Sequence, residues 1–287
     1  MQPNPARVDR GALSVRGVML PWGVRTYVMG IVNVTPDSFS GDGVAGAHAA
    51  TERALAQWDA GAEILDIGGE STRPGHQPID TSVELARVLP VIRAVRSRLP
   101  HAAISVDSYK PDVVRAARGA GADIVNSVWG ASDELLDTAA ELDMPFVATH
   151  NRHGTGDAAD VVDTVLRFLD DCATRAVGRG IARDRVVLDP GIGFGKTADQ
   201  NLAVLRDLDR VVALGFPTLL GASRKSTIGK LTGREPPDRV YGSVAVAALA
   251  VKAGIDVVRV HDVAAARDAV AVADAIVRDW RPAGWTG

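Results

Sequence analysis

The stretch Ala60-Gly61-Ala62-Glu63-Ile64-Leu65-Asp66-Ile67 places a glycine between an alanine-rich helical segment and a short apolar run. Glycine commonly ends an α-helix, and a short run of aliphatic residues is typical of a parallel strand buried on both faces. The same entry recurs as Ala120-Gly121-Ala122-Asp123 and as Ala253-Gly254-Ile255-Asp256. The recurrence indicates one helix–strand unit that is used several times along the chain.

Eight apolar runs alternate with helical stretches. The expected strands are Tyr27–Val34, Glu63–Ile67, Ala103–Asp107, Asp123–Val128, Phe146–Thr149, Arg185–Asp189, Thr218–Gly221 and Val257–Val260. The expected helices are Ala47–Ala60, Thr81–Arg98, Pro111–Gly119, Asp133–Leu142, Val161–Gly178, Asp199–Leu214, Val240–Ala253 and Val263–Asp279. Eight units with right-handed crossovers predict an α/β fold, a single (β/α)₈ TIM barrel, and an open doubly wound sheet is the alternative.

A short segment precedes the first unit. Leu13–Arg25 contains the turn Leu20-Pro21-Trp22-Gly23 between two apolar runs, which predicts an N-terminal β-hairpin that plugs the N-terminal end of the barrel. We therefore expect a tail over residues 1–11, one barrel domain over residues 12–280, and a C-terminal tail over residues 281–287.

Composition excludes several classes of protein. The 287 residues include 32 Lys and Arg against 35 Asp and Glu, a net charge of −3, so nucleic acid is not an expected partner. The single cysteine, Cys172, cannot form an internal disulfide, and no apolar run is long enough to span a membrane. The N-terminus lacks the apolar stretch of a signal peptide, so we expect a cytoplasmic protein.

Polar residues fall at or near the ends of nearly all the expected strands. They are Asn33, Asp66, Asp107, Asn126, His150, Asp189, the segment Ser223–Ser226, Arg259 and His261. An isolated aspartate in such a place is more often a helix N-cap. Because the carboxyl ends of all barrel strands meet at one rim, their convergence there predicts a functional site.

Two residues of the last strand suit an anion. Arg259 and His261 are one residue apart, so their side chains share a face of the strand. A guanidinium beside an imidazole fits a phosphate group. Taken alone, His261 would be read as a helix cap or a buried histidine.

Three other strand ends suit a flat polar heterocycle. Asp107, Asn126 and Asp189 supply two carboxylates and an amide, which can pair with amino and carbonyl edges of a ring. Lys225 can donate to the acceptors of such a ring, while its stem packs against a second, apolar ring.

Long ordered motifs carry a resemblance to a known family. Asn33-Val34-Thr35-Pro36-Asp37-Ser38-Phe39-Ser40 and Asp66-Ile67-Gly68-Gly69-Glu70-Ser71-Thr72-Arg73-Pro74-Gly75 resemble the first two signatures of dihydropteroate synthase. Asp189–Lys196, Gly221–Ser226 and Arg259–Val263 resemble its later signatures.

The resemblance implies an alkyl-group transferase of folate biosynthesis. Such an enzyme joins 6-hydroxymethyl-7,8-dihydropterin diphosphate to p-aminobenzoate and releases diphosphate and 7,8-dihydropteroate. It also implies Mg²⁺ as cofactor, a target of sulfonamides, and a homodimer. The Ala- and Val-rich faces of the late helices permit a dimer interface, but packing against the barrel explains them equally well.

The resemblance also assigns residues. The implied catalytic residues are Asp37, Asp107, Lys225, Arg259 and His261, and the implied metal ligand is Asn33. Thr72, Arg73, Asp107, Asn126, Asp189, Lys225, Arg259 and His261 would bind the pterin diphosphate. Phe39, Pro74, Phe194, Lys225 and Ser226 would bind p-aminobenzoate. Ser226 is expected to begin a helix, whose N-terminus favours the carboxylate.

Two other functions remain open at this point. A pterin-binding methyltransferase domain that acts with a corrinoid protein could share the barrel and the pterin clamp, but it needs no diphosphate site. A non-catalytic paralogue could bind pterin alone. The pair Arg259 and His261, and Ser226 after Lys225, favour the synthase.

Overall fold

Eight parallel strands close into a barrel. The computed structural model describes residues 10–35, 44–71, 77–151 and 161–286, and its main sheet has the strand order β8-β7-β6-β5-β4-β3-β10-β9. The strands are β3 (Tyr27–Asn33), β4 (Ile64–Gly68), β5 (Ala103–Asp107), β6 (Ile124–Ser127), β7 (Phe146–Thr149), β8 (Val186–Asp189), β9 (Leu219–Leu220) and β10 (Val257–Val260). A parallel bridge between Leu188 and Thr218 joins the two edges of the sheet. The barrel prediction is confirmed, and the open sheet is excluded.

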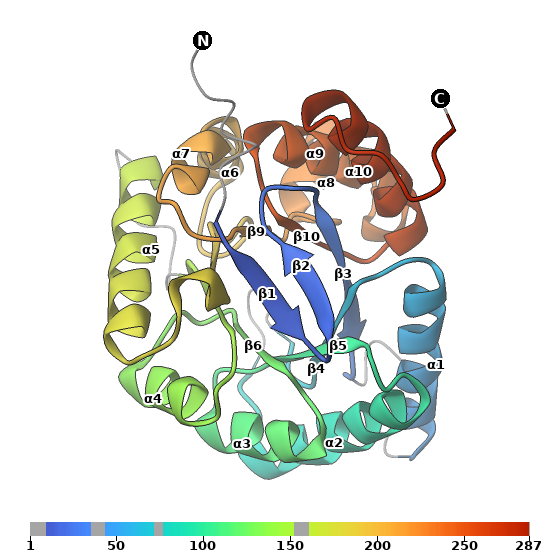
Figure 1. The fold of residues 1–287 in the computed structure, drawn as a ribbon, viewed down its shortest axis with the longest axis vertical. Helices are drawn as coiled ribbons and strands as arrows, with labels where there is room; N and C mark the ends of the chain where they lie inside the picture. Colours follow the sequence, from blue (N-terminus) through green and yellow to red (C-terminus); the bar gives the residue numbers. More distant parts are fainter. Residues whose placement is uncertain (1–9, 36–43, 72–76, 152–160, 287) are drawn as a thin grey trace.

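Helices surround the strands in sequence order (Figure 1). They are α1 (Val44–Asp59), α2 (Thr81–Arg98), α3 (Pro111–Ala120), α4 (Asp133–Glu141), α5 (Val161–Gly178), α6 (Ala198–Arg206), α7 (Leu208–Val212), α8 (Ser226–Thr232), α9 (Val240–Ala253) and α10 (Val263–Val277). Short 3₁₀ helices lie at Arg183–Arg185 and Pro236–Asp238. None of the described helices is long and apolar enough to cross a membrane.

One predicted helix is wrong. The sequence predicts a continuous helix over Asp199–Leu214, but the structure divides it into α6 and α7. The break is at Asp207, whose backbone leaves the helical region (φ −106°, ψ 28°). A short side chain that competes for backbone hydrogen bonds favours such a break.

The N-terminal hairpin is confirmed, but its turn was placed wrongly. Strands β1 (Ala12–Val15) and β2 (Val18–Pro21) are antiparallel and joined by Arg16 and Gly17. Both turn residues have positive φ (52° and 79°), as a two-residue hairpin turn requires. The predicted turn at Leu20–Gly23 instead leads from the hairpin towards β3, and the Trp22 N–H still donates to the Gly11 carbonyl at 2.9 Å.

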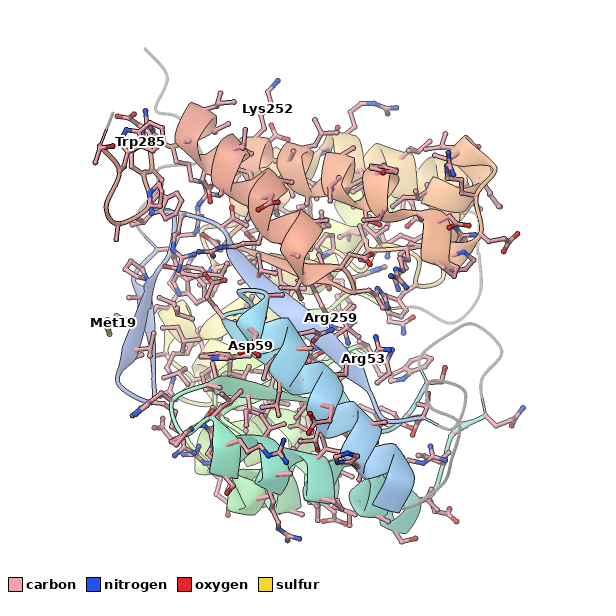
Figure 2. The ribbon with its side chains drawn as sticks, turned by 90° about the vertical axis from the view of Figure 1, so that its right-hand side faces the viewer. Met19, Arg53, Asp59, Lys252, Arg259 and Trp285 are labelled. Carbon is pink, nitrogen blue, oxygen red and sulfur yellow. The ribbon has the colours of Figure 1, made fainter. Side chains whose placement is uncertain are left out.

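The hairpin covers the N-terminal end of the barrel, as the sequence predicts. Its buried side chains Leu13, Leu20 and Trp22 join one apolar cluster with the inward-facing residues at that end of the strands. Trp22 packs edge-on against Tyr27, with the ring centroids 5.9 Å apart. In Figure 2, Met19 lies on the outer face of the hairpin and Arg259 lies inside the molecule. The hairpin therefore closes this end of the barrel, and the carboxyl ends of the strands lie at the other end.

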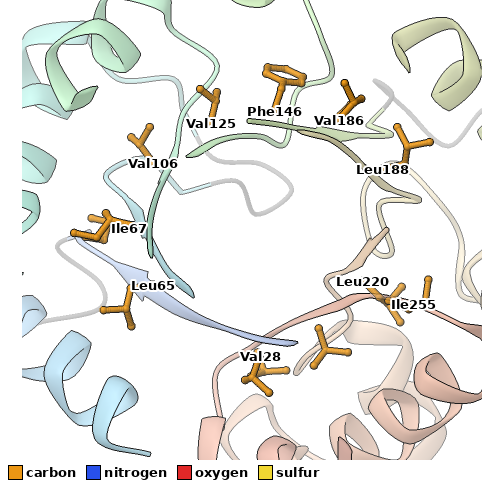
Figure 3. Packing of buried hydrophobic residues seen from close by; sticks show 14 of the residues in the cluster. Val28, Leu65, Ile67, Val106, Val125, Phe146, Val186, Leu188, Leu220 and Ile255 are labelled. Atoms are coloured by element: carbon orange, nitrogen blue, oxygen red, sulfur yellow. The ribbon is translucent and has the colours of Figure 1, made fainter. Parts of the chain in front are cut away.

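Strand alternation separates the core from the site. Outward side chains such as Leu65, Val106 and Leu188 pack between the barrel and the helices (Figure 3). The inward positions change character along each strand. At the hairpin end they are apolar, as in Ile64, Ile124, Val187 and Val257, and two residues later they are Asp66, Asn126, Asp189 and Arg259. A period of two thus places a ring of polar groups just above an apolar floor.

Candidate active site

Arg259 joins carboxylates from two strands across the barrel. Its Nε donates to Asp66 Oδ2 at 2.6 Å, and its Nη2 donates to Asp107 Oδ2 at 2.8 Å. The Asn126 amide donates to the same Asp66 oxygen at 3.0 Å. The four side chains come from β10, β4, β5 and β6, so the closed barrel alone brings them together.

Each carboxylate of this cluster has an oxygen to spare. Asp66 is fully buried, and its Oδ1 accepts no hydrogen bond from a described residue. The same holds for Oδ1 of Asp107. Buried polar atoms usually have partners, so these oxygens are acceptors ready for a ligand with N–H groups.

Burial and charge set the protonation of this cluster. Burial raises the pKa of Asp107 to about 7, an effect that Arg259 opposes and Asp66 reinforces. Burial would lower the pKa of Arg259, but the carboxylates of Asp66 and Asp107 outweigh it and the pKa rises. Arg259 is therefore a permanent cation, whereas Asp107 is poised near neutrality.

Asp189 extends the ring on the other side of Arg259. Its Oδ1 accepts the Gly191 N–H at 2.8 Å, and burial raises its pKa while that hydrogen bond opposes the rise. Gly221 separates it from Arg259: a Cβ there would lie 3.4 Å from Asp189 Oδ2 and 3.9 Å from Arg259 Cδ. Glycine at this position keeps the space between the two groups open.

Lys225 and Phe194 meet at the rim. The Lys225 ammonium lies 3.8 Å from the centre of the Phe194 ring. Gly193 has φ +82°, and a Cβ there would lie 2.9 Å from Lys225 Cδ, so only glycine lets the lysine stem lie across this loop. A cation, an aliphatic stem and a buried ring thus share one corner of the rim. Ser226 follows as the first, exposed residue of α8, which confirms the predicted helix start.

A buried lysine organises the loop after β8. The Lys196 ammonium donates to the Gly191 carbonyl at 2.8 Å and lies 2.8 Å from His150 Nδ1. It also donates to the Phe194 carbonyl at 3.3 Å. Lys196 and His150 therefore hold the loop that carries Phe194, which is a structural role that the motif alone does not reveal.

His261 is held by the neighbouring loop. Its backbone N–H donates to Ser223 Oγ at 3.2 Å, and its Nδ1 lies 3.1 Å from the same oxygen. Burial lowers the pKa of His261, and the nearby guanidinium groups of Arg259 and Arg224 lower it further, to about 3 in all. The imidazole is neutral at physiological pH.

Asn33 is half-buried at the carboxyl end of β3, in register with Gly68. Within the described ranges, no group of three His, Cys, Asp or Glu side chains could hold a metal ion by itself. One amide oxygen could be the protein's contribution to a Mg²⁺ site, because this ion keeps several waters and binds largely through substrate phosphates.

Of the nine predicted site residues that the structure describes, six gather in two groups at one end of the barrel. Asp107, Asn126, Asp189 and Arg259 form the inward ring, and Phe194 and Lys225 meet at its rim. The predicted residues Asp37, Phe39, Thr72, Arg73 and Pro74 lie outside the described residues.

The sequence places Asp66 and Ser223 among the polar residues of the rim but gives neither of them a role. In the structure, Asp66 is the shared acceptor for Arg259 and Asn126. Ser223 was treated as part of a motif, and no sequence pattern indicated its contact with His261.

Known proteins resemble this chain over most of its length. The model of the family described as pterin binding enzyme matches residues 29–261. A dihydropteroate synthase of Synechocystis is 42% identical over 279 residues, covering 94% of this chain and 95% of the relative. One of Clostridium beijerinckii is 40% identical over 260 residues, covering 89% of this chain and 96% of the relative.

Solved structures agree. Dihydropteroate synthase of Xanthomonas albilineans with 4-aminobenzoic acid superposes with a TM-score of 0.89 at 44% identity, over 96% of this chain and all (100%) of that one. The same organism's enzyme in complex with 7,8-dihydropteroate gives a TM-score of 0.82 at 43% identity, over 90% of this chain and 95% of that one. The family match over residues 29–261 and the identity to these relatives show that the chain belongs to the dihydropteroate synthase family of pterin-binding enzymes.

Proposed function

We propose that this transferase condenses 6-hydroxymethyl-7,8-dihydropterin diphosphate with p-aminobenzoate at the inward ring of the barrel. The main support for this proposal is a pair of buried oxygens, Asp66 Oδ1 and Asp107 Oδ1, that have no hydrogen-bond partner among the described residues. A dihydropterin presents N–H groups along one edge, and these would fill the vacant acceptor positions.

The pterin ring lies between Asp107, Asn126 and Asp189, with Lys225 donating to its acceptor edge. Asp66 orients the Asn126 amide by accepting one of its N–H groups. Arg259 has Nη1 left over from its two carboxylate contacts and directs it, with His261, at the diphosphate. The family resemblance also assigns Thr72 and Arg73, which lie outside the described residues, to the binding of the pterin diphosphate.

The bond between the pterin methylene carbon and the diphosphate oxygen breaks, and the aniline nitrogen of p-aminobenzoate forms the new bond to that carbon. Cationic character develops on the pterin methylene group and is stabilised by the carboxylate of Asp107, with Asp37 as a second candidate. Asn33 would help to hold Mg²⁺, which when bound would neutralise charge on the leaving diphosphate. The aniline loses its proton to water or diphosphate after the bond has formed.

The p-aminobenzoate ring packs on Phe194 and the Lys225 stem, and Ser226 binds its carboxylate. The family resemblance also assigns Phe39 and Pro74, which lie outside the described residues, to this ligand. The contact between Lys225 and Phe194 supports this placement, because it joins the pterin corner to an apolar surface. Sulfonamides, which resemble p-aminobenzoate, would compete for the same place.

The protein acts as a homodimer in the cytoplasm. Tyr241 and Leu249 on α9, and Val272 and Ile276 on α10, are 78%, 61%, 62% and 78% exposed, although all are large apolar side chains. The two helices lie side by side (Figure 1), and a second copy of the chain would cover this face.

The function is tested by an assay for diphosphate release. Release must depend on both the pterin diphosphate and p-aminobenzoate, and it must stop when Mg²⁺ is chelated. Pterin binding without any p-aminobenzoate-dependent release would favour the non-catalytic paralogue. Methyl transfer to a corrinoid protein in place of diphosphate release would favour the methyltransferase domain.

Replacing Asp189 with alanine should weaken pterin binding. The variant loses a buried charged hydrogen-bond partner, at a cost of about 2–3 kcal/mol, or roughly 30- to 150-fold in affinity. Titration calorimetry with a pterin that lacks phosphates measures this directly. Asp170→Ala, an exposed position on α5, is the matched control and should bind as the parent protein does. Parent-like affinity in a folded Asp189→Ala variant would remove Asp189 from the pterin site.

A further inference from the structure

The loop after β9 and the loop after β10 are joined by two successive pairs of residues beside the proposed diphosphate site. Ser223, after β9, contacts His261, after β10, through both the backbone N–H and the ring Nδ1. The next residues pair as well: the Arg224 Nε donates to Asp262 Oδ2 at 2.9 Å, and a second bond joins the same side chains. The position of His261 is thus set from outside its own strand.

The loop after β9 is itself firmly held. Arg224 has φ +57°, a left-handed conformation that is uncommon for a side chain of this size. Its N–H donates to Ser243 Oγ at 3.0 Å, and its carbonyl accepts from Arg239 at 2.9 Å. These hydrogen bonds, together with the ion pair between Arg224 and Asp262, restrain the backbone next to Ser223. They thereby keep the Ser223 hydroxyl close to the His261 imidazole.

The available donors and acceptors determine which of Ser223 Oγ and His261 Nδ1 donates the hydrogen bond between them. Ser223 Oγ accepts the backbone N–H of His261, so its own hydroxyl proton remains to be donated. Among the described residues, His261 Nδ1 is the one acceptor within reach of that proton. Ser223 is 7% exposed, which favours this internal partner over water. Nδ1 therefore accepts, and the ring proton resides on Nε2.

The electrostatic surroundings agree with a neutral ring. Burial, Arg259, Arg224 and Lys225 all lower the pKa of His261, and Asp262 alone among the main neighbours raises it. A neutral imidazole has one N–H, and which nitrogen carries it depends on the hydrogen bond made by the other nitrogen.

We propose that Ser223 is a positioning residue that holds His261 in its neutral, Nε2-protonated tautomer, so that the ring presents one N–H donor to the leaving diphosphate. This proposal rests on the proposed function for the identity of the anion, but the tautomer itself does not. His261 then acts as a fixed dipole rather than as a cation, while Arg259 supplies the charge.

Nuclear magnetic resonance of the ¹⁵N-labelled full chain tests the tautomer without any substrate. Correlations from the ring carbon protons to the ring nitrogens distinguish protonated from unprotonated nitrogens, and loss of a signal set in His261→Gln assigns them. We expect a protonated Nε2 and a bare Nδ1 near neutral pH. Ser223→Ala should mix the two tautomers, and Ser223→Thr, which keeps the hydroxyl, should retain the parent pattern.

Titration with Mg²⁺ and inorganic diphosphate tests the consequence. Ser223→Ala should bind diphosphate roughly tenfold more weakly, the typical effect of one lost hydrogen bond, and Ser223→Thr should recover most of the affinity. A protonated Nδ1 in the parent protein, or parent-like tautomer or affinity in Ser223→Ala, would overturn the proposal. Failure of the parent protein to bind diphosphate would count against the proposed function, whereas the spectrum would still decide the tautomer.

Discussion

Replacing Arg259 with alanine should lower the free energy of unfolding by about 3–5 kcal/mol, because the change leaves two buried carboxylates without their shared counter-charge. Arg259 donates to Asp66 at 2.6 Å and to Asp107 at 2.8 Å, and both acceptors are buried. Urea denaturation near pH 8, above the pKa of about 7 of Asp107 in the parent protein, measures the loss.

The loss should depend on pH. Arg259 lowers the pKa of Asp107, so its removal raises that pKa further, and a proton can then take the place of the guanidinium. The destabilisation should therefore be smaller near pH 5 than near pH 8. Arg259→Lys keeps a charge but loses the planar fork, so it should recover only part of the stability.

A surface ion pair supplies the control. Arg115 donates to Glu141 at 2.6 Å, but the two side chains are 43% and 62% exposed. Arg115→Ala should cost less than about 1 kcal/mol at either pH. If Arg259→Ala costs no more than this control, Arg259 is not the counter-charge of the ring. Because its Nη1 also faces the diphosphate in the proposed mechanism, Arg259→Ala should also weaken the binding of Mg²⁺ with inorganic diphosphate.

The barrel could be predicted from the sequence because it depends on local periodicity. Each strand is a short apolar run with a helix-ending glycine or a turn before it, and such runs keep their identity wherever they lie in the chain. The prediction of one continuous helix over Asp199–Leu214 is wrong for a local reason, because the backbone of Asp207 leaves the helical region. The predicted position of the hairpin turn is wrong because Pro21 and Gly23 are strong turn formers, whereas Arg16, in the actual turn, is not.

The site was predictable at the ends of strands and not within them. Asp107, Asn126 and Asp189 stand out as polar residues that end apolar runs. Asp66 lies within β4, two residues before its end at Gly68. Its role comes from its hydrogen bonds with Asn126 and Arg259, which are 60 and 193 positions away in the sequence. Contacts of this range depend on the register and closure of the barrel, which single-strand patterns do not contain. The pairing of Ser223 with His261 depends on them in the same way.

Replacing Asp107 with asparagine should reduce kcat by roughly 10²- to 10³-fold, since it removes a charge placed where positive charge develops in the transition state. Asparagine keeps the size and an acceptor for Arg259 Nη2, so the effect isolates the charge. In the parent protein, kcat/KM should fall as pH drops below about 7, because burial raises the pKa of Asp107 to about 7 and the charged form is required. The variant should lack this acidic limb, and steady-state assays across the pH range will show whether it does.

Stability should move in the opposite direction. The unfolded carboxyl of Asp107 has its ordinary pKa near 3.8, whereas the folded one titrates near 7, so between these values the folded chain binds a proton that the unfolded chain has lost. Folding stability contributed by this group therefore falls as pH rises through that window and stays low above it. Asp107→Asn escapes that penalty and should match or exceed the parent protein in urea near pH 8, while the two should differ little near pH 4. Asp170→Asn, at the exposed position on α5, should change neither activity nor stability. A variant that loses stability near pH 8 but keeps its turnover would make Asp107 a structural partner of Arg259 and not the charge that stabilises the reacting pterin.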